Sequence, residues 1–401
     1  MFKTLSLDKL YQSMLIILAF LMPLTVFGAN LIIVIICLLW LFSGNYKYKY
    51  NQIVNSKILL ASIFFFALHV VALIWTEDIS WGFHIVHKMW YFLLLFPVLY
   101  SIVKKENIGL YISSFLLAIA LTEIISYLIW LEIIEPFKNA TVKNPTPFMS
   151  HISYNPILAI AIYIVLYKVL FEKNISKFKF FYLIFLSITM SVNMFITGGR
   201  AGQIMFFAMI FILIYQYFDK QKIKAIIASI IILPSIFFSA YELSDIFQER
   251  VNSAISEVIN YSEIKNTNTS VGLRLSFTIN SWEVIKENPF IGVGTGDFPN
   301  EYSKVSKINS PSIMLTKNPH NMYILVLVQL GLIGLISFLS IFYYQIKFSF
   351  NSDNKFLRDF GLTLPVLFLI IMLSDAYLLG HYTTLMYIFF SSFLHNNFDK
   401  S

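Results

Sequence analysis

Arg200 is the first side chain whose type and setting could do chemistry. It lies between two apolar runs, in Thr197-Gly198-Gly199-Arg200-Ala201-Gly202. Glycine lets a ligand approach the backbone, a helix N-terminus attracts anions, and a guanidinium group binds phosphate through a planar fork of donors. The pattern predicts a phosphate site. It also fits a tight hairpin whose arginine extends to the membrane surface.

Arg274 lies inside a long polar segment, in Val271-Gly272-Leu273-Arg274-Leu275-Ser276-Phe277. The apolar residues that follow are spaced for one face of a helix, and they are Leu275, Ile279, Trp282 and Ile285. Such a helix could lie along a membrane surface with Arg274 directed at lipid headgroups. An ordinary interfacial helix with a solvated arginine is the alternative.

His320 follows Pro319 where the polar segment ends and an apolar run begins. An imidazole at the membrane boundary can take or give a proton near neutral pH. A histidine that is simply part of the polar surface has the same sequence pattern, so this position alone leaves both interpretations open.

Other polar residues are weaker candidates. Lys88 begins an apolar run on the outer side and could add a phosphate contact, and Glu77-Asp78 is an acidic pair that could hold a metal ion. Residues 292–298 are glycine-rich, but their spacing is not that of a dinucleotide-binding fingerprint and favours a structural turn. The sequence contains no nucleotide-binding or serine-hydrolase motif.

Composition identifies the environment in which these residues act. Of the 401 residues, 58% are apolar and 13% are charged, against about 25% charged in an average soluble domain. The mean hydropathy is +0.72, so the excess apolar surface must face lipid. The net charge of +7 would suggest nucleic acid in a soluble protein, but here it fits basic cytoplasmic loops. A single cysteine, Cys37, excludes an intramolecular disulfide.

The apolar runs predict an all-helical polytopic membrane protein. Twelve runs are candidate spans, at about 12–27, 29–43, 57–75, 88–103, 108–134, 152–171, 179–197, 202–218, 222–240, 320–347, 356–374 and 380–396. With both termini in the cytoplasm, the inside segments hold 18 of the 29 Lys and Arg residues and the short outer loops hold 4, which is the expected bias. The chain then divides into spans 1–9 (residues 1–240), a periplasmic loop with amphipathic helices (241–319) and spans 10–12 (320–401).

Taken together, these features make the chain resemble the bacterial O-antigen ligase and O-antigen polymerase superfamily. The resemblance covers the twelve spans, the large outer loop and a set of short motifs in a fixed order. The motifs are Thr197-Gly198-Gly199-Arg200, Gly272-Leu273-Arg274-Leu275, Asn288-Pro289-Phe290-Ile291-Gly292-Val293-Gly294, Pro319-His320-Asn321, Gln329-Leu330-Gly331-Leu332-Ile333-Gly334 and Ser374-Asp375.

The resemblance implies a site and a fold. In such ligases two arginines and one histidine form the functional core, and these match Arg200, Arg274 and His320. The implied fold is the GT-C type of membrane glycosyltransferase, and the implied reaction inverts the anomeric carbon without a metal. Many ligases carry Glu directly after His-Asn, whereas this chain has Met322 there, so an acidic partner for the histidine is in question.

The function that follows is an O-antigen ligase of the inner membrane in lipopolysaccharide biosynthesis, acting on the periplasmic side. It would transfer a glycan from undecaprenyl diphosphate to lipid A–core, among membrane lipids and without cofactor, nucleotide or nucleic acid. Arg200, Arg274 and Lys88 would bind the diphosphate, His320 would be the base, and Asn321 and Asp375 would support it. The alternatives are an O-antigen polymerase, a polysaccharide transporter, or a metal-dependent glycosyltransferase that uses Glu77-Asp78.

Overall fold

The protein is all-helical, as predicted. The computed structural model describes residues 2–138, 140–264 and 269–398. Within these ranges there is no β-strand, only one isolated bridge between Thr141 and Asn144. The helices pack into two compact units. Unit 1 comprises residues 1–32 and 106–252, and unit 2 comprises residues 33–105 and 253–401.

Several helices are suited to cross a membrane, which confirms a multi-pass membrane protein. Among the described residues eight helices are long and apolar enough, or nine if α2 (Val26–Phe42) and α3 (Tyr46–Val54), which meet at 112°, form one broken span. The predicted count of twelve is not confirmed. The helices α16 (Lys355–Ile371) and α17 (His381–Leu394) have 17 and 14 residues, whereas a perpendicular span needs about 20.

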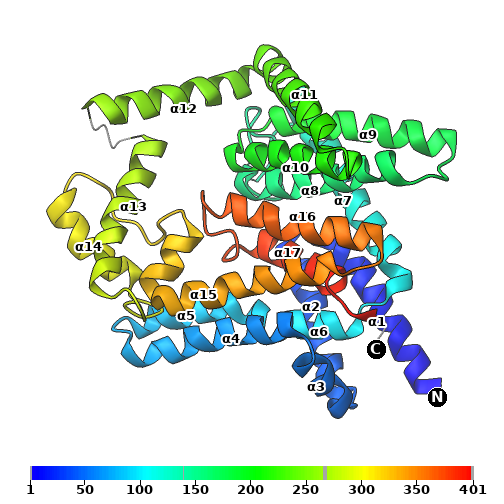
Figure 1. Cartoon of the computed structure of the whole chain (residues 1–401), viewed down its shortest axis with the longest axis horizontal. Coiled ribbons are helices and arrows are strands. Elements are labelled where there is room, and N and C mark those ends of the chain that lie inside the picture. Colours follow the sequence, from blue (N-terminus) through cyan, green and yellow to red (C-terminus); the bar gives the residue numbers. More distant parts are fainter. Residues whose placement is uncertain (1, 139, 265–268, 399–401) are drawn as a thin grey trace. The chain divides into compact units, whose positions relative to one another are not determined.

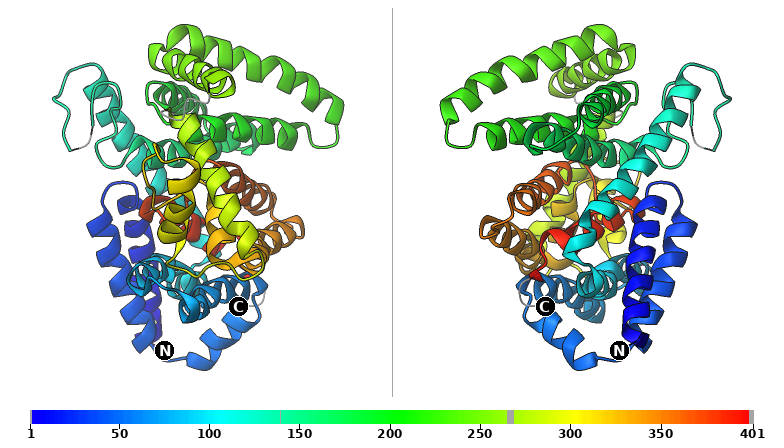
Figure 2. Two further views of the ribbon diagram at one scale, coloured as in Figure 1. Left: turned by 90° about the vertical axis from the view of Figure 1, so that its left-hand side faces the viewer. Right: turned by 90° about the vertical axis from the view of Figure 1, so that its right-hand side faces the viewer.

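Unit 1 is built around α8 (His151–Phe171), which packs against both α9 and α10. Every side chain from Tyr154 to Val165 is buried, as expected of a helix that is apolar on all sides and enclosed by others. The other helices of this unit, several of them green in Figures 1 and 2, are α1 (Phe2–Leu21), α7 (Ile108–Trp130), α9 (Lys177–Phe195), α10 (Arg200–Phe218) and α11 (Lys222–Leu243). The residues of α2 and α12 (Asp245–Ile264) are divided between the two units.

Unit 2 is built around α15 (Met322–Phe350), which packs against α4, α13, α14 and α16. The remaining helices of this unit are α4 (Lys57–Val71), α5 (Ile79–Trp90), α6 (Phe96–Ile102), α13 (Ser270–Glu287) and α14 (Phe298–Asn309), with α3, α16 and α17. Short 3-10 turns at Ala72–Trp75 and Lys105–Asn107, and a π-helical turn at Tyr91–Leu95, connect or extend them.

The central helix α15 is broken at Gly331, whose φ and ψ are 62° and −160°. A break in a membrane helix leaves peptide groups without their helical partners. Residues 289–294, here called the clasp, lie against the break and supply those partners. The four backbone hydrogen bonds are Val293 N–Val328 O (2.8 Å), Gly294 N–Gln329 O (3.0 Å), Leu332 N–Pro289 O (2.8 Å) and Ile333 N–Phe290 O (3.2 Å).

The contact between the clasp and α15 is too close for side chains at two positions. A Cβ at Gly331 would lie 2.3 Å from the Phe290 carbonyl carbon, and one at Gly292 would lie 2.4 Å from that of Gln329. Both glycines also have positive φ, which glycine adopts without a steric penalty. The glycine-rich segment therefore has a structural role, as its spacing predicted.

The segment after the clasp ties α4 and α5 to the same joint. Thr295 Oγ1 donates to the His69 carbonyl oxygen at 2.7 Å. The buried Asp297 carboxylate accepts from the backbone N–H groups of Glu77 (2.8 Å) and Asp78 (2.7 Å). Residues 289–297 thus connect three helices of unit 2 through buried and partly buried hydrogen bonds.

Two details differ from the sequence predictions. The span predicted from residue 88 begins earlier, because Asp78 caps α5 and a helix runs from Ile79 to Ile102. In α13, Leu275, Ile279 and Trp282 are exposed as predicted for one apolar face, but Ile285 is only 6% exposed and points inward. Residues 241–319 contain the helices α12, α13 and α14. The three-part division of the chain, with amphipathic helices in a periplasmic loop, stays a prediction.

Gly331→Ala should lower the melting temperature of the detergent-purified protein. A non-glycine residue at positive φ costs about 1–3 kcal/mol, and the new Cβ also meets the Phe290 backbone. Gly109→Ala is the matched control, because a Cβ there meets nothing within 4 Å and alanine is the better helix former. Equal melting temperatures for the two variants would contradict the structural role assigned to the break.

Candidate functional site

His320 occupies a fixed turn at the start of α15. Its φ is 54°, which is uncommon for a residue with a side chain. Asn318 Oδ1 accepts from His320 N at 3.0 Å, and Asn321 Oδ1 caps α15 by accepting from the N–H groups of Tyr323 (3.0 Å) and Ile324 (3.1 Å). The asparagines on either side of Pro319-His320 thus determine where the imidazole points.

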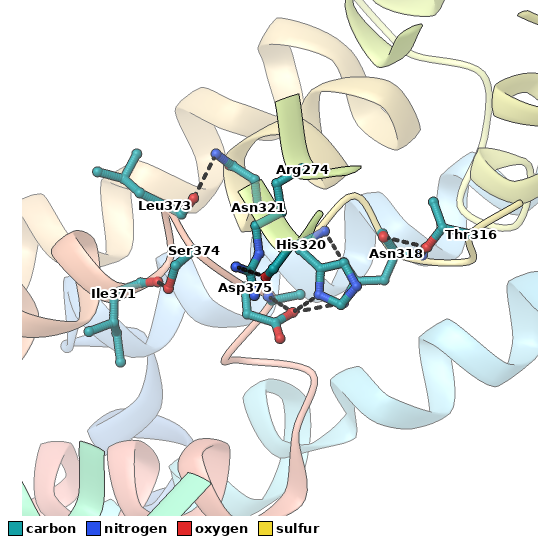
Figure 3. A network of polar contacts seen from close by, with 11 residues as sticks. Arg274, Thr316, Asn318, His320, Asn321, Ile371, Leu373, Ser374 and Asp375 are labelled. Carbon is teal, nitrogen blue, oxygen red and sulfur yellow. Dashed lines mark hydrogen bonds and ion pairs between the residues drawn. The ribbon is translucent and has the colours of Figure 1, made fainter. Parts of the chain in front are cut away.

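Asp375, in the connection between α16 and α17, is the acidic partner of His320 (Figure 3). Its Oδ1 lies 3.3 Å from His320 Nδ1 and accepts from Asn318 Nδ2 at 2.9 Å. Burial raises the pKa of the Asp375 carboxyl, but its hydrogen bond and charge interaction with His320, with help from the Ala376 N–H and Asn318, outweigh burial and hold the pKa below its usual value. The arrangement pairs an imidazole with an ionised carboxylate.

The two chain segments that carry His320 and Asp375 are joined by further hydrogen bonds. Asn321 Nδ2 donates to the Leu373 carbonyl oxygen at 3.2 Å, and Met322 N donates to that of Met372 at 2.9 Å. Met322, at the position where many ligases carry Glu, is fully buried. The methionine at position 322 put an acidic partner for His320 in question. That partner is Asp375, which comes from the connection between α16 and α17.

Helix α13 brings Arg274 to the same place. Phe277 stacks on the His320 ring, with centroids 6.0 Å apart and planes inclined at 23°. Arg274 lies three residues before Phe277, one helical turn away on a shared face. Its Nη1 donates to Ser270 Oγ at 3.0 Å, and no carboxylate among the described residues lies within 4.0 Å of it.

Tyr377 is a further member of this cluster. Burial and the charge of Asp375 raise the pKa of the Tyr377 phenol, whereas the charge of Arg274 opposes this rise. Both groups therefore lie within electrostatic range of the same hydroxyl. His320, Asp375, Arg274 and Tyr377 form one polar cluster in unit 2, which Figure 3 shows for the first three.

Lys88 and the acidic pair lie on or beside α5. Lys88 is in the last turn of this helix. Asp78 Oδ1 accepts from Trp81 N at 2.9 Å, so this carboxylate acts as a helix cap. In the described part of the chain no three His, Cys, Asp or Glu side chains are grouped so that they could hold a metal ion. Lys317 lies over the Trp81 ring, 4.6 Å from its centroid.

Arg200, in unit 1, is the first residue of α10. The glycines around it accommodate α8, because a Cβ at Gly202 would lie 2.2 Å from Asn155 Cβ and one at Gly199 would lie 2.7 Å from the Asn155 amide. Asn155 Oδ1 also accepts from Thr197 Oγ1 at 2.8 Å. These two glycines thus serve helix packing, in place of the ligand approach that the sequence suggested.

Of the predicted site residues, the structure brings together His320, Arg274, Asn321 and Asp375 in unit 2. Arg200 belongs to unit 1. Sequence reasoning missed Phe277, Asn318 and Tyr377. Asn318 had a local signal, since an asparagine before Pro-His is suited to a side-chain turn. Nothing local marks Phe277 or Tyr377, whose roles depend on contacts across unit 2.

Comparison with known proteins confirms the resemblance that the motifs indicated. A family model described as O-antigen ligase matches residues 185–339, a stretch that includes Arg200, Arg274 and His320. An uncharacterized protein of Haemophilus influenzae is 30% identical over 167 residues, which are 40% of this chain and 41% of that protein. The family is one of membrane proteins of the O-antigen ligase and polymerase type.

The lowered pKa of Asp375 predicts a pH-dependent stability. An ionised carboxylate of this kind stabilises the fold above its unfolded pKa of about 3.9, and the contribution is lost as the pH falls through the folded pKa. His320→Gln removes the partner of Asp375 and should raise the pKa of its carboxyl. The loss of stability on acidification should then occur at a higher pH than in the wild type. Melting temperatures measured between pH 3 and 6 test this.

The control for that measurement is the Asp375→Asn background. There, His320→Gln should leave the pH profile of the melting temperature unmoved, because the titrating carboxyl is absent. An equal displacement in both backgrounds would assign the effect to another group.

Proposed function

We propose that the protein is an O-antigen ligase, a membrane glycosyltransferase that transfers a glycan from undecaprenyl diphosphate to lipid A–core. The family match supports a membrane enzyme acting on lipid-linked glycans. The observation that carries the proposal is the His320–Asp375 pair at 3.3 Å, covered by the helix that bears Arg274. An imidazole backed by a carboxylate is suited to remove a proton from a sugar hydroxyl.

The mechanism is an inverting displacement in this proposal. His320 accepts the proton of an acceptor hydroxyl at Nε2, since Nδ1 faces Asp375. The freed oxygen forms a bond to the anomeric carbon from the face opposite the diphosphate. The bond between that carbon and the diphosphate oxygen breaks, and undecaprenyl diphosphate leaves with the electron pair. Asp375 orients the imidazole and stabilises its protonated form.

The leaving group gains negative charge, and arginine can stabilise it. Arg274 is the first candidate, because its guanidinium lies in the His320 cluster and has no carboxylate partner in the described part of the chain. Arg200 and Lys88 are the further candidates for the diphosphate. Because the glycosyl bond to the diphosphate is already activated, the transfer needs no nucleotide, and guanidinium groups can replace a divalent metal as the charge stabiliser.

The proposed setting is the bacterial inner membrane, with the site facing the periplasm and both termini in the cytoplasm. The distribution of Lys and Arg over the short loops supports this orientation. The twelve-span arrangement of the GT-C type is part of the same proposal. The helices α12, α13 and α14 of the polar segment would then lie on the periplasmic side, where the glycan acceptor is found.

His320→Ala, Arg274→Ala and Asp375→Asn should each reduce glycan transfer while the protein still inserts into the membrane. Loss of a general base costs about 10²–10⁴ in rate, and Arg274→Lys should also be impaired, because lysine loses the bidentate fork. Transfer by membranes from each variant is measured with gel analysis of lipopolysaccharide. The matched control for His320→Ala is His87→Ala, which changes an exposed histidine of α5. The matched control for Arg274→Ala is Lys286→Ala, which changes an exposed basic residue of α13. Near-normal transfer by the His320 and Arg274 variants would refute the assignment.

Purified protein should join lipid-linked glycan to lipid A–core without added metal or nucleotide, and EDTA should leave the rate unchanged. The nearest alternative is an O-antigen polymerase, which uses the same donor and a second lipid-linked glycan as acceptor. A deletion strain separates the two activities. Loss of a ligase leaves polymer on the carrier lipid and bare core, whereas loss of a polymerase leaves core capped with single repeats.

A further inference from the structure

The start of α12 is anchored to unit 1 in a way that fixes the direction of Arg250. Ser244 Oγ donates to the Phe195 carbonyl oxygen at 2.8 Å. Phe247, 4% exposed, packs edge-on against Phe195 and Phe237 with ring centroids 5.0 and 5.5 Å apart. Arg250 lies three residues after Phe247 and therefore shares its helix face.

On that face, the Arg250 guanidinium rests on the turn that precedes Arg200. A Cβ at Gly198 would lie 2.9 Å from Arg250 Nη2 and 3.1 Å from its Nε. The same Cβ would lie 2.8 Å from Asn144 Oδ1. Gly198 is not among the glycines with positive φ, so the close approach of the guanidinium and of the Asn144 amide oxygen, and not backbone conformation, explains the glycine. Asn144 Oδ1 holds the same turn by accepting from Gly198 N at 2.9 Å.

The charges around this turn are mostly positive. Arg250 and Arg200 are both only partly exposed. The neighbouring Glu249 is directed to Lys143, at 3.9 Å, where both side chains are largely exposed. No carboxylate in the described part of the chain lies within 4.0 Å of Arg250. A partly buried guanidinium without a carboxylate is suited to an anion that arrives with a ligand.

We propose that Arg250 binds, together with Arg200, a phosphate group of a lipid ligand at the Gly198 turn. The inference rests on the proposed function, in which that ligand is the undecaprenyl diphosphate donor. Gly198 is then the position that admits the second guanidinium to the turn. Arg250 acts through direct contact with the phosphate oxygens, beside the arginine that the family motif contains.

Arg250→Ala should weaken binding of undecaprenyl diphosphate to the purified full-length protein in nanodiscs of neutral lipid. The loss of charge-assisted hydrogen bonds predicts an increase in Kd of about 10- to 100-fold, and Arg250→Lys should lie between this variant and the wild type. The controls are Lys143→Ala and Glu249→Gln, which change the adjacent exposed pair and should leave Kd unchanged. Melting temperatures without ligand show that each variant is folded.

Gly198→Ala tests the assigned contact. The added Cβ should displace the guanidinium and weaken binding, and it would also meet Asn144 Oδ1 at 2.8 Å. The effect of Gly198→Ala on Kd should therefore be smaller in the Arg250→Ala background, where only the Asn144 contact remains to be disturbed. A wild-type Kd for Arg250→Ala would overturn the inference, and so would an unchanged effect of Gly198→Ala in that background. A further experiment measures binding to nanodiscs that contain phosphatidylglycerol. If Arg250→Ala weakened binding of phosphatidylglycerol but not of undecaprenyl diphosphate, the assignment of the site to the donor would be overturned.

The binding measurement keeps this inference separate from the proposed function. If the wild-type protein binds undecaprenyl diphosphate through Arg250 but transfers no glycan to lipid A–core, the ligase assignment fails and the phosphate site stands. If transfer is observed and the Arg250 variants bind and transfer normally, the ligase assignment stands and the phosphate site fails.

Discussion

The organisation of unit 2 depends on how backbone hydrogen bonds are completed where α15 breaks. The interior of a bilayer offers no water to satisfy peptide groups, so a broken helix is tolerated only if protein supplies the partners. The clasp supplies two N–H donors and two carbonyl acceptors at the break. Glycine at positions 292 and 331 follows from this, because the two backbones approach more closely than a Cβ permits.

The same joint determines what surrounds the candidate site. The first half of α15 begins at the turn that holds His320, and the chain leaving the clasp runs through Thr295 and Asp297 into α14. Helix α14 packs against α13, and α13 packs against α15. The backbone contacts between the clasp and α15 therefore help to position both the helix that bears Arg274 and the helix that begins next to His320. Arg274 and His320 themselves are distant from each other in the sequence.

Some residues of this site can be predicted from the sequence, whereas others have no local sequence signal. Their local setting leaves Arg274 and His320 as candidates with ordinary alternatives, and the resemblance of their motifs to those of a known family selects them. The glycine-rich segment has the structural role that its spacing predicts. Phe277 and Tyr377 have no such local signal, because a stacked ring or a nearby phenol depends on helices that meet only in the folded chain. The helical spacing places Ile285 on the exposed face of α13, but the residue is buried, because spacing does not show which sides of that helix α14 and α15 cover. The sequence leaves open whether the glycines at 199 and 202 admit a ligand or form a tight hairpin, because it does not show that Asn155 of α8 fills the space.

The position of Asp375 has a consequence for how chains with these motifs are recognised from sequence. Many ligases carry an acid directly after His-Asn, and this chain has a buried methionine there. A search pattern that requires the adjacent acid would reject this chain, although a carboxylate lies 3.3 Å from the imidazole. In this chain the acid beside the imidazole lies 55 positions along the sequence from the histidine, so a pattern confined to adjacent residues does not contain it.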